Sequence, residues 1–151
     1  MFFGNYELTL DEKGRLVIPS KYREKLTVNL YLLKGFDGCI SIYDENEFTK
    51  YMTKLQQLPF ENPKARSYNR LITSSIVEFQ IDKSGRILLS SKIQNEYKIG
   101  KNVVINGVLD HFEIWDKDAW ESYKNEHVEG FEDDAMMLGN YEKWCSCSNN
   151  A

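Results

Sequence analysis

The sequence predicts an α+β, β-rich fold built from two pseudo-symmetric halves. The main observation is an internal repeat, because residues 11–21 (DEKGRLVIPSK) match residues 82–92 (DKSGRILLSSK) at an offset of 71 positions. A second match relates residues 39–44 to residues 111–116 at an offset of 72. Two copies are too few for a solenoid, which needs several units to bury a continuous core. We therefore expect two similar halves packed about a pseudo-twofold axis.

The composition is that of a globular protein without a membrane segment. The 151 residues are 42% hydrophobic and 13% aromatic, which suffices for a buried core. No apolar run approaches the roughly 20 residues of a membrane span, and the start lacks the features of a secretory signal. We therefore expect a cytoplasmic protein. Its cysteines, Cys39, Cys145 and Cys147, fit neither a disulfide framework nor a zinc site, so we expect reduced thiols, no metal and no cofactor.

Charge is distributed unevenly along the chain. Residues 1–100 carry 15 Lys and Arg against 12 Asp and Glu, whereas residues 101–151 carry 4 against 11. The formal net charge of −4 argues against non-specific coating of nucleic acid, which depends on clustered cations. A local basic site in the first 100 residues remains compatible with these numbers.

Each repeat begins with a predicted strand, turn and return strand. Apolar residues alternate at Tyr6, Leu8 and Leu10 in the first copy and at positions 77, 79 and 81 in the second. The Asp-x-x-Gly that follows fits a type I turn, closed by a glycine in the left-handed conformation. The return strands, 16–18 and 87–89, would complete a bulged hairpin in each half.

Short helices and a strand pair follow each return strand. Ser20 and Ser91 are predicted to start the helices, and Ser91 with Gln94 has the capping-box spacing. Residues 28–33 and 39–43 predict one strand pair, and 103–108 with 112–115 its counterpart.

Two further helices are predicted between the halves. Asp44 and Glu47 have the spacing of a cap, and the apolar stripe of the first helix is Phe48, Tyr51, Met52 and Leu55. Asn62 and Pro63 start the second helix, with Tyr68, Leu71 and Ile72 on one side. From His127 onward the acidic, then polar composition predicts a weakly anchored helix or a disordered tail.

The repeated motif resembles that of a known protein family. Asp-x-x-x-Arg occurs twice, at residues 11–15 and 82–86, and Pro19, Lys21 and Arg23 follow the first copy. This pattern resembles the MraZ proteins of bacteria. The resemblance implies paired swapped-hairpin, AbrB-like β-barrel halves with short helices in a subunit that assembles into a ring, commonly an octamer. It also implies binding to short promoter repeats upstream of the division and cell-wall gene cluster, and a nucleoid-associated location.

On this basis we divide the chain into a first AbrB-like repeat at 1–58, a connecting helix at 59–75, a second repeat at 76–126 and a tail at 127–151. The chain departs from the family pattern at two places. Ser90 stands where the pattern favours proline, and the tail beyond about residue 126 is unfamiliar.

The expected site consists of basic residues in the two turns. For Arg15 and Arg86 we weigh two interpretations: an ion pair with the motif aspartate, which contributes little when exposed, or contact with phosphate or guanine through the planar guanidinium. The two are compatible, because an aspartate can orient an arginine. The family resemblance favours the DNA role. Lys13 and Lys83 sit beside the turn tips and are candidate phosphate contacts, although a solvated lysine is an equal alternative for Lys13.

The remaining motif residues are expected to be structural. Turn chemistry alone requires Asp11, Gly14, Asp82 and Gly85, whatever the surface binds. No nucleophile elbow, phosphate-binding loop or zinc-protease motif occurs, so we expect no enzyme activity. The alternative to a DNA-binding regulator is an antitoxin-like or scaffold oligomer without specific DNA binding. A hydrolase would require the two motif aspartates to converge on one cleft.

Overall fold

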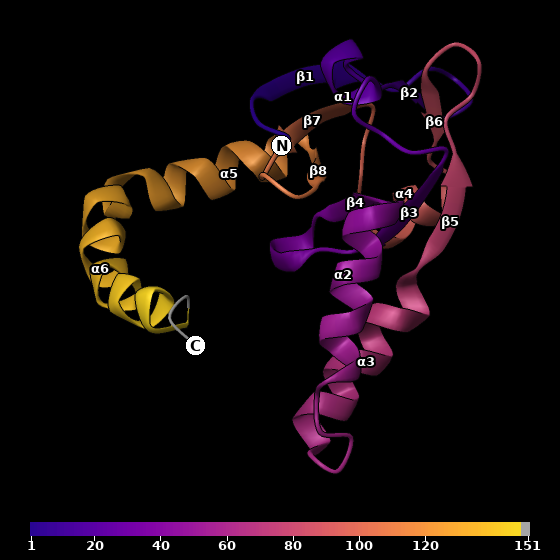
Figure 1. The fold of residues 1–151 in the computed structure, drawn as a ribbon. Coiled ribbons are helices and arrows are strands. Elements are labelled where there is room, and N and C mark those ends of the chain that lie inside the picture. The colour runs from indigo at the N-terminus through magenta and orange to yellow at the C-terminus, as the bar shows by residue number, and fades with distance from the viewer. Residues whose placement is uncertain (149–151) are drawn as a thin grey trace. The chain divides into compact units, whose positions relative to one another are not determined.

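The computed structural model describes the backbone of residues 1–148 and the side chains of residues 1–139 (Figure 1). The chain divides into two compact units, Met1–Lys117 and Asp118–Ala151. Both copies of the repeat lie in the first unit. The described part is α+β, with a mostly antiparallel arrangement of strands and short helices.

The elements follow the predicted order. The strands are β1 (Asn5–Thr9), β2 (Arg15–Val17), β3 (Asn29–Lys34), β4 (Ile40–Asp44), β5 (Val77–Gln80), β6 (Arg86–Leu88), β7 (Asn102–Gly107) and β8 (Phe112–Asp116). The helices are α1 (Ser20–Arg23), α2 (Glu45–Gln56), α3 (Pro63–Ser75), α4 (Ser91–Glu96), α5 (Lys117–His127) and α6 (Phe131–Ser148), with 3₁₀ turns η1 (Phe36–Gly38) and η2 (Val128–Gly130).

The two halves exchange their first strands. The main sheet has six strands in the order β1-β7-β8-β4-β3-β5. The predicted pairs β3–β4 and β7–β8 are confirmed, and both are antiparallel. However, β1 of the first half pairs with β7 of the second, and β5 of the second half pairs with β3 of the first. Each half thus completes the sheet of the other.

The predicted local hairpins are therefore wrong in their pairing. The strand β2 does not continue a ladder with β1; it pairs with β6 in a separate two-stranded sheet. The physical reason lies in burial, because Leu16 and Ile87 point into the core shared by both halves and are 0% and 1% exposed. A ladder between the two returning strands buries both side chains against the same sheet. The exchange agrees with the swapped-hairpin arrangement implied by the resemblance.

The six-stranded sheet is open, with β1 and β5 at its edges. The barrel closure expected from the resemblance is thus absent from the hydrogen bonding of the described residues. Instead, the β2–β6 pair lies as a second layer, and the main core fills the space between it and the sheet. This core includes the buried aromatic residues Phe2, Tyr22 and Phe112.

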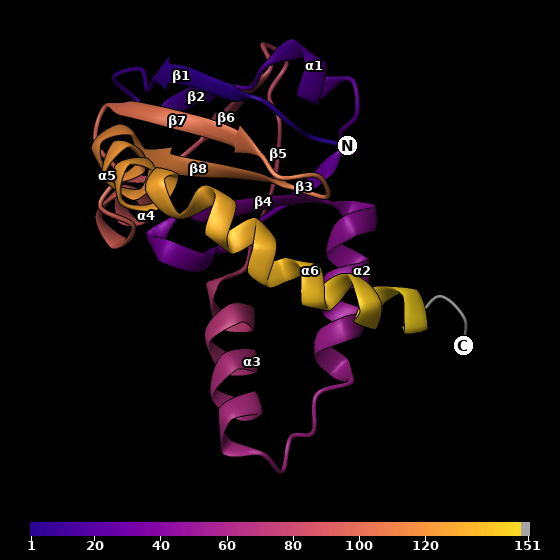
Figure 2. The same ribbon diagram turned by 90° about the vertical axis from the view of Figure 1, so that its left-hand side faces the viewer.

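Helices α2 and α3 form a hairpin that extends from the sheet (Figure 2). Their contacts with β3 and β4 make a second apolar cluster around Leu33, Tyr43, Leu55 and Ile72. The expected stripe of α2 faces this cluster. The prediction for α3 is wrong at Leu71, whose side chain is 56% exposed, because its neighbour Ile72 takes the inward position.

Side-chain caps start three of these helices. Asp44 Oδ1 accepts a hydrogen bond from the N–H of Glu47 at 2.8 Å, and Asn62 Oδ1 accepts from the N–H of Lys64 at 2.9 Å, as predicted. In α4 the cap is Ser90, whose hydroxyl accepts from the N–H of Ile93 at 3.3 Å. The predicted capping box at Ser91 is therefore displaced by one residue, and Gln94 instead donates to a carbonyl oxygen outside the helix.

The second unit is helical up to Ser148, which agrees with the helical alternative for the tail. Within the described residues, no helix combines the length and apolar character needed to cross a membrane. Cys39 is a free, buried thiol in the first unit. The side chains of Cys145 and Cys147 lie outside the described residues.

Candidate nucleic-acid interface

The first motif turn is organised around the carboxylate of Asp11. Its Oδ1 accepts hydrogen bonds from the backbone N–H groups of Lys13 and Arg15, at 2.9 and 2.8 Å. Its Oδ2 accepts from Nε of Arg15 at 2.7 Å. The N–H of Gly14 donates to the Asp11 carbonyl oxygen at 3.0 Å, and this glycine has a φ of 82°. The aspartate therefore shapes the turn and orients the arginine at the same time.

The second turn repeats this geometry. Asp82 Oδ1 accepts from the N–H groups of Ser84 and Arg86, both at 2.9 Å, and Oδ2 accepts from Nε of Arg86 at 2.9 Å. Gly85 has a φ of 77°. Residues 11–18 and 82–89 also share the same sequence of exposed, half-buried and buried positions. The repeat seen in the sequence is thus a repeat in three dimensions.

These hydrogen bonds favour the ionised form of both aspartates. The backbone N–H of Arg15 lowers the pKa of Asp11 most strongly, and its guanidinium adds to the effect. The backbone N–H and guanidinium of Arg86 lower the pKa of Asp82 in the same way. The intramotif ion pair, one of the two predicted interpretations, is therefore present in both turns.

The ion pair leaves part of each guanidinium available. Within each guanidinium, only Nε donates to the motif aspartate, and the terminal amino groups have no hydrogen-bond partner among the residues that the structure describes. Both side chains are about one-third exposed, at 32% and 29%. Each guanidinium can therefore donate two parallel hydrogen bonds to a phosphate or to the acceptors of a guanine.

Both arginines lie on the same outward surface. We call the strand pair Arg15–Val17 and Arg86–Leu88 the β2–β6 ribbon. In its register, Arg15 is opposite Leu88 and Val17 is opposite Arg86. Side chains alternate along a strand, and directly opposite residues share a face. The two arginines are therefore diagonal neighbours on the outer face, while Leu16 and Ile87 form the inner face.

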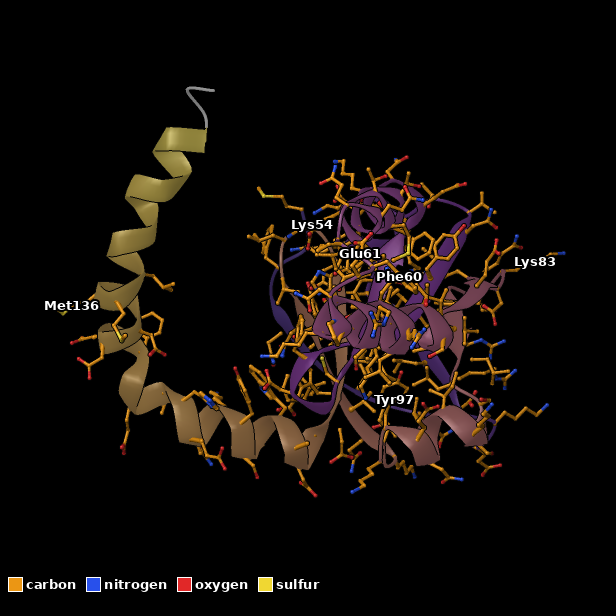
Figure 3. The ribbon with its side chains drawn as sticks, turned by 90° about the horizontal axis from the view of Figure 1, so that it is seen from below. Lys54, Phe60, Glu61, Lys83, Tyr97 and Met136 are labelled. Atoms are coloured by element: carbon orange, nitrogen blue, oxygen red, sulfur yellow. The ribbon has the colours of Figure 1, made fainter. Side chains whose placement is uncertain are left out.

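Lysines flank the ribbon at both ends. Lys13 and Lys83 are exposed in the two turns, and Figure 3 shows Lys83 projecting away from the body of the protein. Lys21 and Lys92 are exposed at the starts of α1 and α4, directly beyond the two ribbon strands. Arg23 of α1 lies against Gly85 in the second turn. The structure thus brings basic residues from both halves together around one ribbon.

The two halves also support each other's turns. The Gly14 carbonyl oxygen accepts a hydrogen bond from the N–H of Leu89 at 2.8 Å, and the Gly85 carbonyl oxygen accepts from the N–H of Ile18 at 2.9 Å. Gln94 of α4 covers Gly14 in the first turn, at the repeat position that matches Arg23 in the second. Each turn is therefore fixed by residues from the opposite half.

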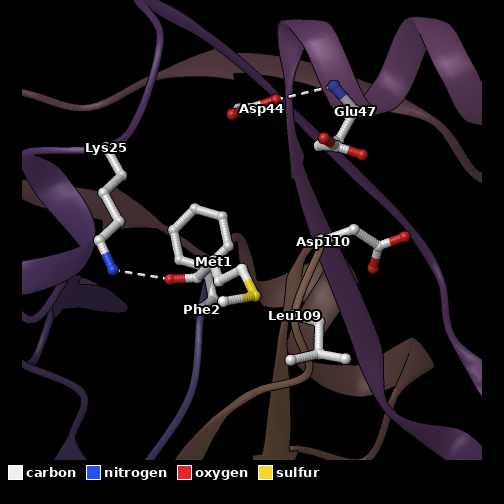
Figure 4. Close-up of a pocket in the computed structure, with 7 residues that line it drawn as sticks. All are labelled: Met1, Phe2, Lys25, Asp44, Glu47, Leu109 and Asp110. Atoms are coloured by element: carbon white, nitrogen blue, oxygen red, sulfur yellow. Dashed lines mark hydrogen bonds between the residues drawn. The ribbon is translucent and has the colours of Figure 1, made fainter.

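The geometry gives no support to a hydrolase built on Asp11 and Asp82. The ribbon is antiparallel and each motif precedes one of its strands, so the two turns lie at opposite ends of the ribbon. A pocket elsewhere, of about 280 Å³, is lined in part by Asp44, Glu47 and Lys25 (Figure 4). There Asp44 caps α2, and Lys25 Nζ donates to the Met1 carbonyl oxygen at 2.6 Å. The described residues contain no cluster of three potential metal ligands.

Sequence reasoning did not assign a role to two residues on this surface. Val17 and Leu88 are 50% and 59% exposed and complete the outer face of the ribbon. The sequence does indicate that each of them shares a face with a motif arginine, because Val17 is two positions after Arg15 and Leu88 is two positions after Arg86. The missing information was the pairing of these strands with each other.

Comparison with known proteins extends the similarity to nearly the full chain. A family model described as "MraZ protein, putative antitoxin-like" matches residues 1–71 and 73–140. A protein named transcriptional regulator MraZ from Caldanaerobacter subterraneus is 40% identical over 141 residues, which cover 93% of this chain and 99% of the relative.

Two further relatives carry the same name. The one from Thermoanaerobacter sp. is 41% identical over 138 residues, or 91% of this chain and 96% of the relative. The one from Ligilactobacillus salivarius is 40% identical over 142 residues, or 94% of this chain and 99% of the relative. The similarity includes both Asp-x-x-x-Arg turns and the α2–α3 hairpin between them.

Proposed function

The chain belongs to the MraZ family, and from this premise we propose that it is a DNA-binding transcriptional regulator that inserts the β2–β6 ribbon into the major groove of promoter DNA. The observation that carries the proposal is the position of Arg15 and Arg86 on one outward face of a two-stranded ribbon, each oriented by its aspartate. The names of the relatives support the regulatory role.

The dimensions and chemistry of the major groove fit this surface. The groove is about 12 Å wide and admits a two-stranded β-ribbon. The free terminal amino groups of Arg15 and Arg86 then donate to guanine O6 and N7 or to phosphate oxygens. Lys13 and Lys83 at the turn tips contact the phosphates on either side of the groove, which fixes the orientation of the ribbon.

Fixing each arginine on its aspartate lowers the cost of binding. A free arginine loses side-chain conformational entropy when a ligand immobilises it, whereas Arg15 and Arg86 are already held through Nε. Asp11 and Asp82 also reduce the net positive charge of each turn. This partial neutralisation weakens the binding of DNA by the ribbon of a single subunit.

Assembly compensates for this weakness. A ring of subunits, with eight as the expected number, presents several ribbons to successive short repeats in one promoter. Linked sites raise the overall affinity by about 10²–10⁴ without new contacts. Occupation of the promoter of the division and cell-wall gene cluster would block RNA polymerase, so repression is the default and activation through altered promoter geometry is the alternative. The protein then acts in the cytoplasm at the nucleoid.

The test is binding to the DNA upstream of the chain's own gene, measured by fluorescence anisotropy over a salt series against unrelated DNA of equal length. Arg15→Ala and Arg86→Ala are compared with the wild type. Arg70→Ala on α3 is the matched control, because it removes an exposed arginine that lies outside the ribbon and over the Phe60 ring. We expect each ribbon variant to lose about five- to 150-fold in affinity, which corresponds to the 1–3 kcal/mol of one bidentate base contact.

Light scattering on the same samples separates the two candidate functions. The proposal requires that Arg15→Ala and Arg86→Ala keep the oligomer of the wild type. If the wild type does not prefer the upstream DNA, and the oligomer dissociates in the variants, the ribbon serves assembly. The protein is then an antitoxin-like or scaffold oligomer, as the family description also allows.

A further inference from the structure

The outer face of the β2–β6 ribbon carries an apolar residue beside each arginine. Val17 lies directly opposite Arg86, and Leu88 lies directly opposite Arg15. The Cβ atoms of directly opposite residues are about 5 Å apart. Val17 and Leu88 are 50% and 59% exposed, so no described part of the chain covers them. On this outer face, the two cationic side chains thus lie on one diagonal and the two apolar side chains on the other.

The inner face of the ribbon explains why these residues cannot contribute to the core. Leu16 and Ile87 already fill that side and are almost completely buried. Val17 and Leu88 point the opposite way because side chains alternate along a strand. Threonine has a similar β-strand preference without the cost of exposing a purely apolar side chain, so folding alone does not require valine and leucine here.

The chemistry of the flanking residues identifies what covers this face. Two arginines with free terminal amino groups, together with Lys13 and Lys83 at the turns, match a polyanion. A second copy of the same face would oppose these charges to each other, which is unfavourable. In the major groove of DNA, the apolar group presented by the base edges is the C5-methyl of thymine.

We propose that Val17 and Leu88 are specificity-determining residues that contact thymine methyl groups next to the bases held by Arg86 and Arg15. The inference rests on the proposed function and extends it, because it assigns base recognition to residues other than the motif arginines. Base pairs are spaced by about 3.4 Å and opposite side chains by about 5 Å, so the thymine lies one or two steps from the contacted guanine.

Deoxyuridine provides a direct test, since it pairs as thymidine does but lacks the C5-methyl. The probe is the upstream DNA of the chain's own gene, amplified with either dTTP or dUTP. We expect the wild type to bind the uracil-containing copy at least about fourfold more weakly, the effect of losing one buried methyl group. The slope of affinity against salt should be the same for both copies, because no phosphate contact is lost.

The double variant Val17→Ala/Leu88→Ala identifies the side chains responsible. It should bind the thymine copy more weakly than the wild type and bind the two copies with nearly equal affinity. Val28→Ala is the matched control, because Val28 is 73% exposed and lies outside the ribbon. It should keep the full difference between the copies. Light scattering should give the wild-type oligomer for all three proteins.

Each contrary outcome has a distinct meaning. If the wild type binds the thymine copy specifically and does not distinguish the uracil copy, the methyl contacts are absent and the inference fails while the regulator function stands. Equal sensitivity of the double variant and the wild type to uracil also overturns it, because the methyls then act through DNA shape. Loss of the oligomer in the double variant assigns this face to a second copy and overturns it as well. Failure of the proposed function appears separately, as a wild type without preference for either copy over unrelated DNA.

Discussion

The carbonyl oxygen of Gly14 accepts a hydrogen bond from the N–H of Leu89 at 2.8 Å, so the first motif turn is held by a residue of the opposite half. A Cβ atom added to Gly14 would lie 2.5 Å from the Leu89 carbonyl oxygen and 2.6 Å from Gln94 Nε2. A Cβ added to Gly85 would instead meet the guanidinium of Arg23, the mobile end of a long side chain. The two turns thus share one conformation but differ in their tolerance of a side chain.

Alanine substitution should reveal this difference. Both glycines have positive φ, which costs an L-residue about 1–2 kcal/mol. Gly85→Ala should lower the free energy of unfolding by about that amount, because the Arg23 side chain can move away. Gly14→Ala should lower the free energy of unfolding by about 3 kcal/mol or more, because backbone atoms must shift as well. Urea denaturation of each variant measures these losses.

Gly38→Ala is the control for the conformational cost of a positive φ. This glycine has a φ of 87° and no atom within 4 Å of an added Cβ, so the variant reports the conformational cost alone. Equal losses at Gly14 and Gly85 would show that contact between the halves does not constrain the first turn.

Acid should destabilise the two turns through their aspartates. The folded-state pKa values of Asp11 and Asp82 lie below the unfolded value of about 3.9. Their stabilisation is therefore complete above that pH and is lost as pH falls through the folded-state values. When the pH is lowered from 6 to 3, the Tm of the double variant Asp11→Asn/Asp82→Asn should fall less than the Tm of the wild type.

Two further measurements would test whether these aspartates govern the pH dependence of stability. Glu61→Gln, in the α2–α3 loop, removes a carboxylate without touching either turn and should keep the wild-type pH dependence. The carboxyl carbon resonances of the two aspartates should titrate below pH 3.9 in NMR spectra. An unchanged pH profile in the double variant would mean that other acids govern acid unfolding.

The local elements were predictable from sequence because their signals are local. The strand pairs, the cap at Asp44 and the Asp-x-x-Gly turns depend on residues close in the chain, and all are present in the structure. The same holds for the Asp–Arg pairs, which span four positions.

Strand partners were not predictable in the same way. The local pattern of a short apolar strand such as β2 fits β1 or β6 as a partner, because alternation shows that Leu16 faces inward but not which strand lies beside it. The choice depends on long-range packing of both halves. For this reason sequence reasoning identified Arg15 and Arg86 separately but did not identify the continuous outer face that also includes Val17 and Leu88.

Strand exchange predicts that neither half folds alone as a monomer. A fragment of residues 1–75 keeps β3–β4 and the helical hairpin but loses β7, the partner of β1, and β6, the partner of β2. It also exposes Leu16 and Ile18, which are completely buried in the intact chain. We expect the fragment to be unfolded or to associate with itself. Circular dichroism and light scattering distinguish a stable monomer, which would contradict the prediction, from these outcomes.

Lys83 should contribute to DNA affinity through charge alone. It directly follows Asp82, projects from the second turn, and has no hydrogen bond or ion pair to another described residue. Lys83→Ala should weaken binding to the upstream DNA and to unrelated DNA by the same factor, because phosphates carry no sequence information. The slope of log affinity against log salt should fall by about one for each engaged subunit. Lys54→Ala on α2 removes an equal charge outside the ribbon and should leave that slope unchanged. An effect of Lys83→Ala confined to the upstream DNA would instead place this lysine on a base edge and would require the second turn to enter the groove more deeply than the first.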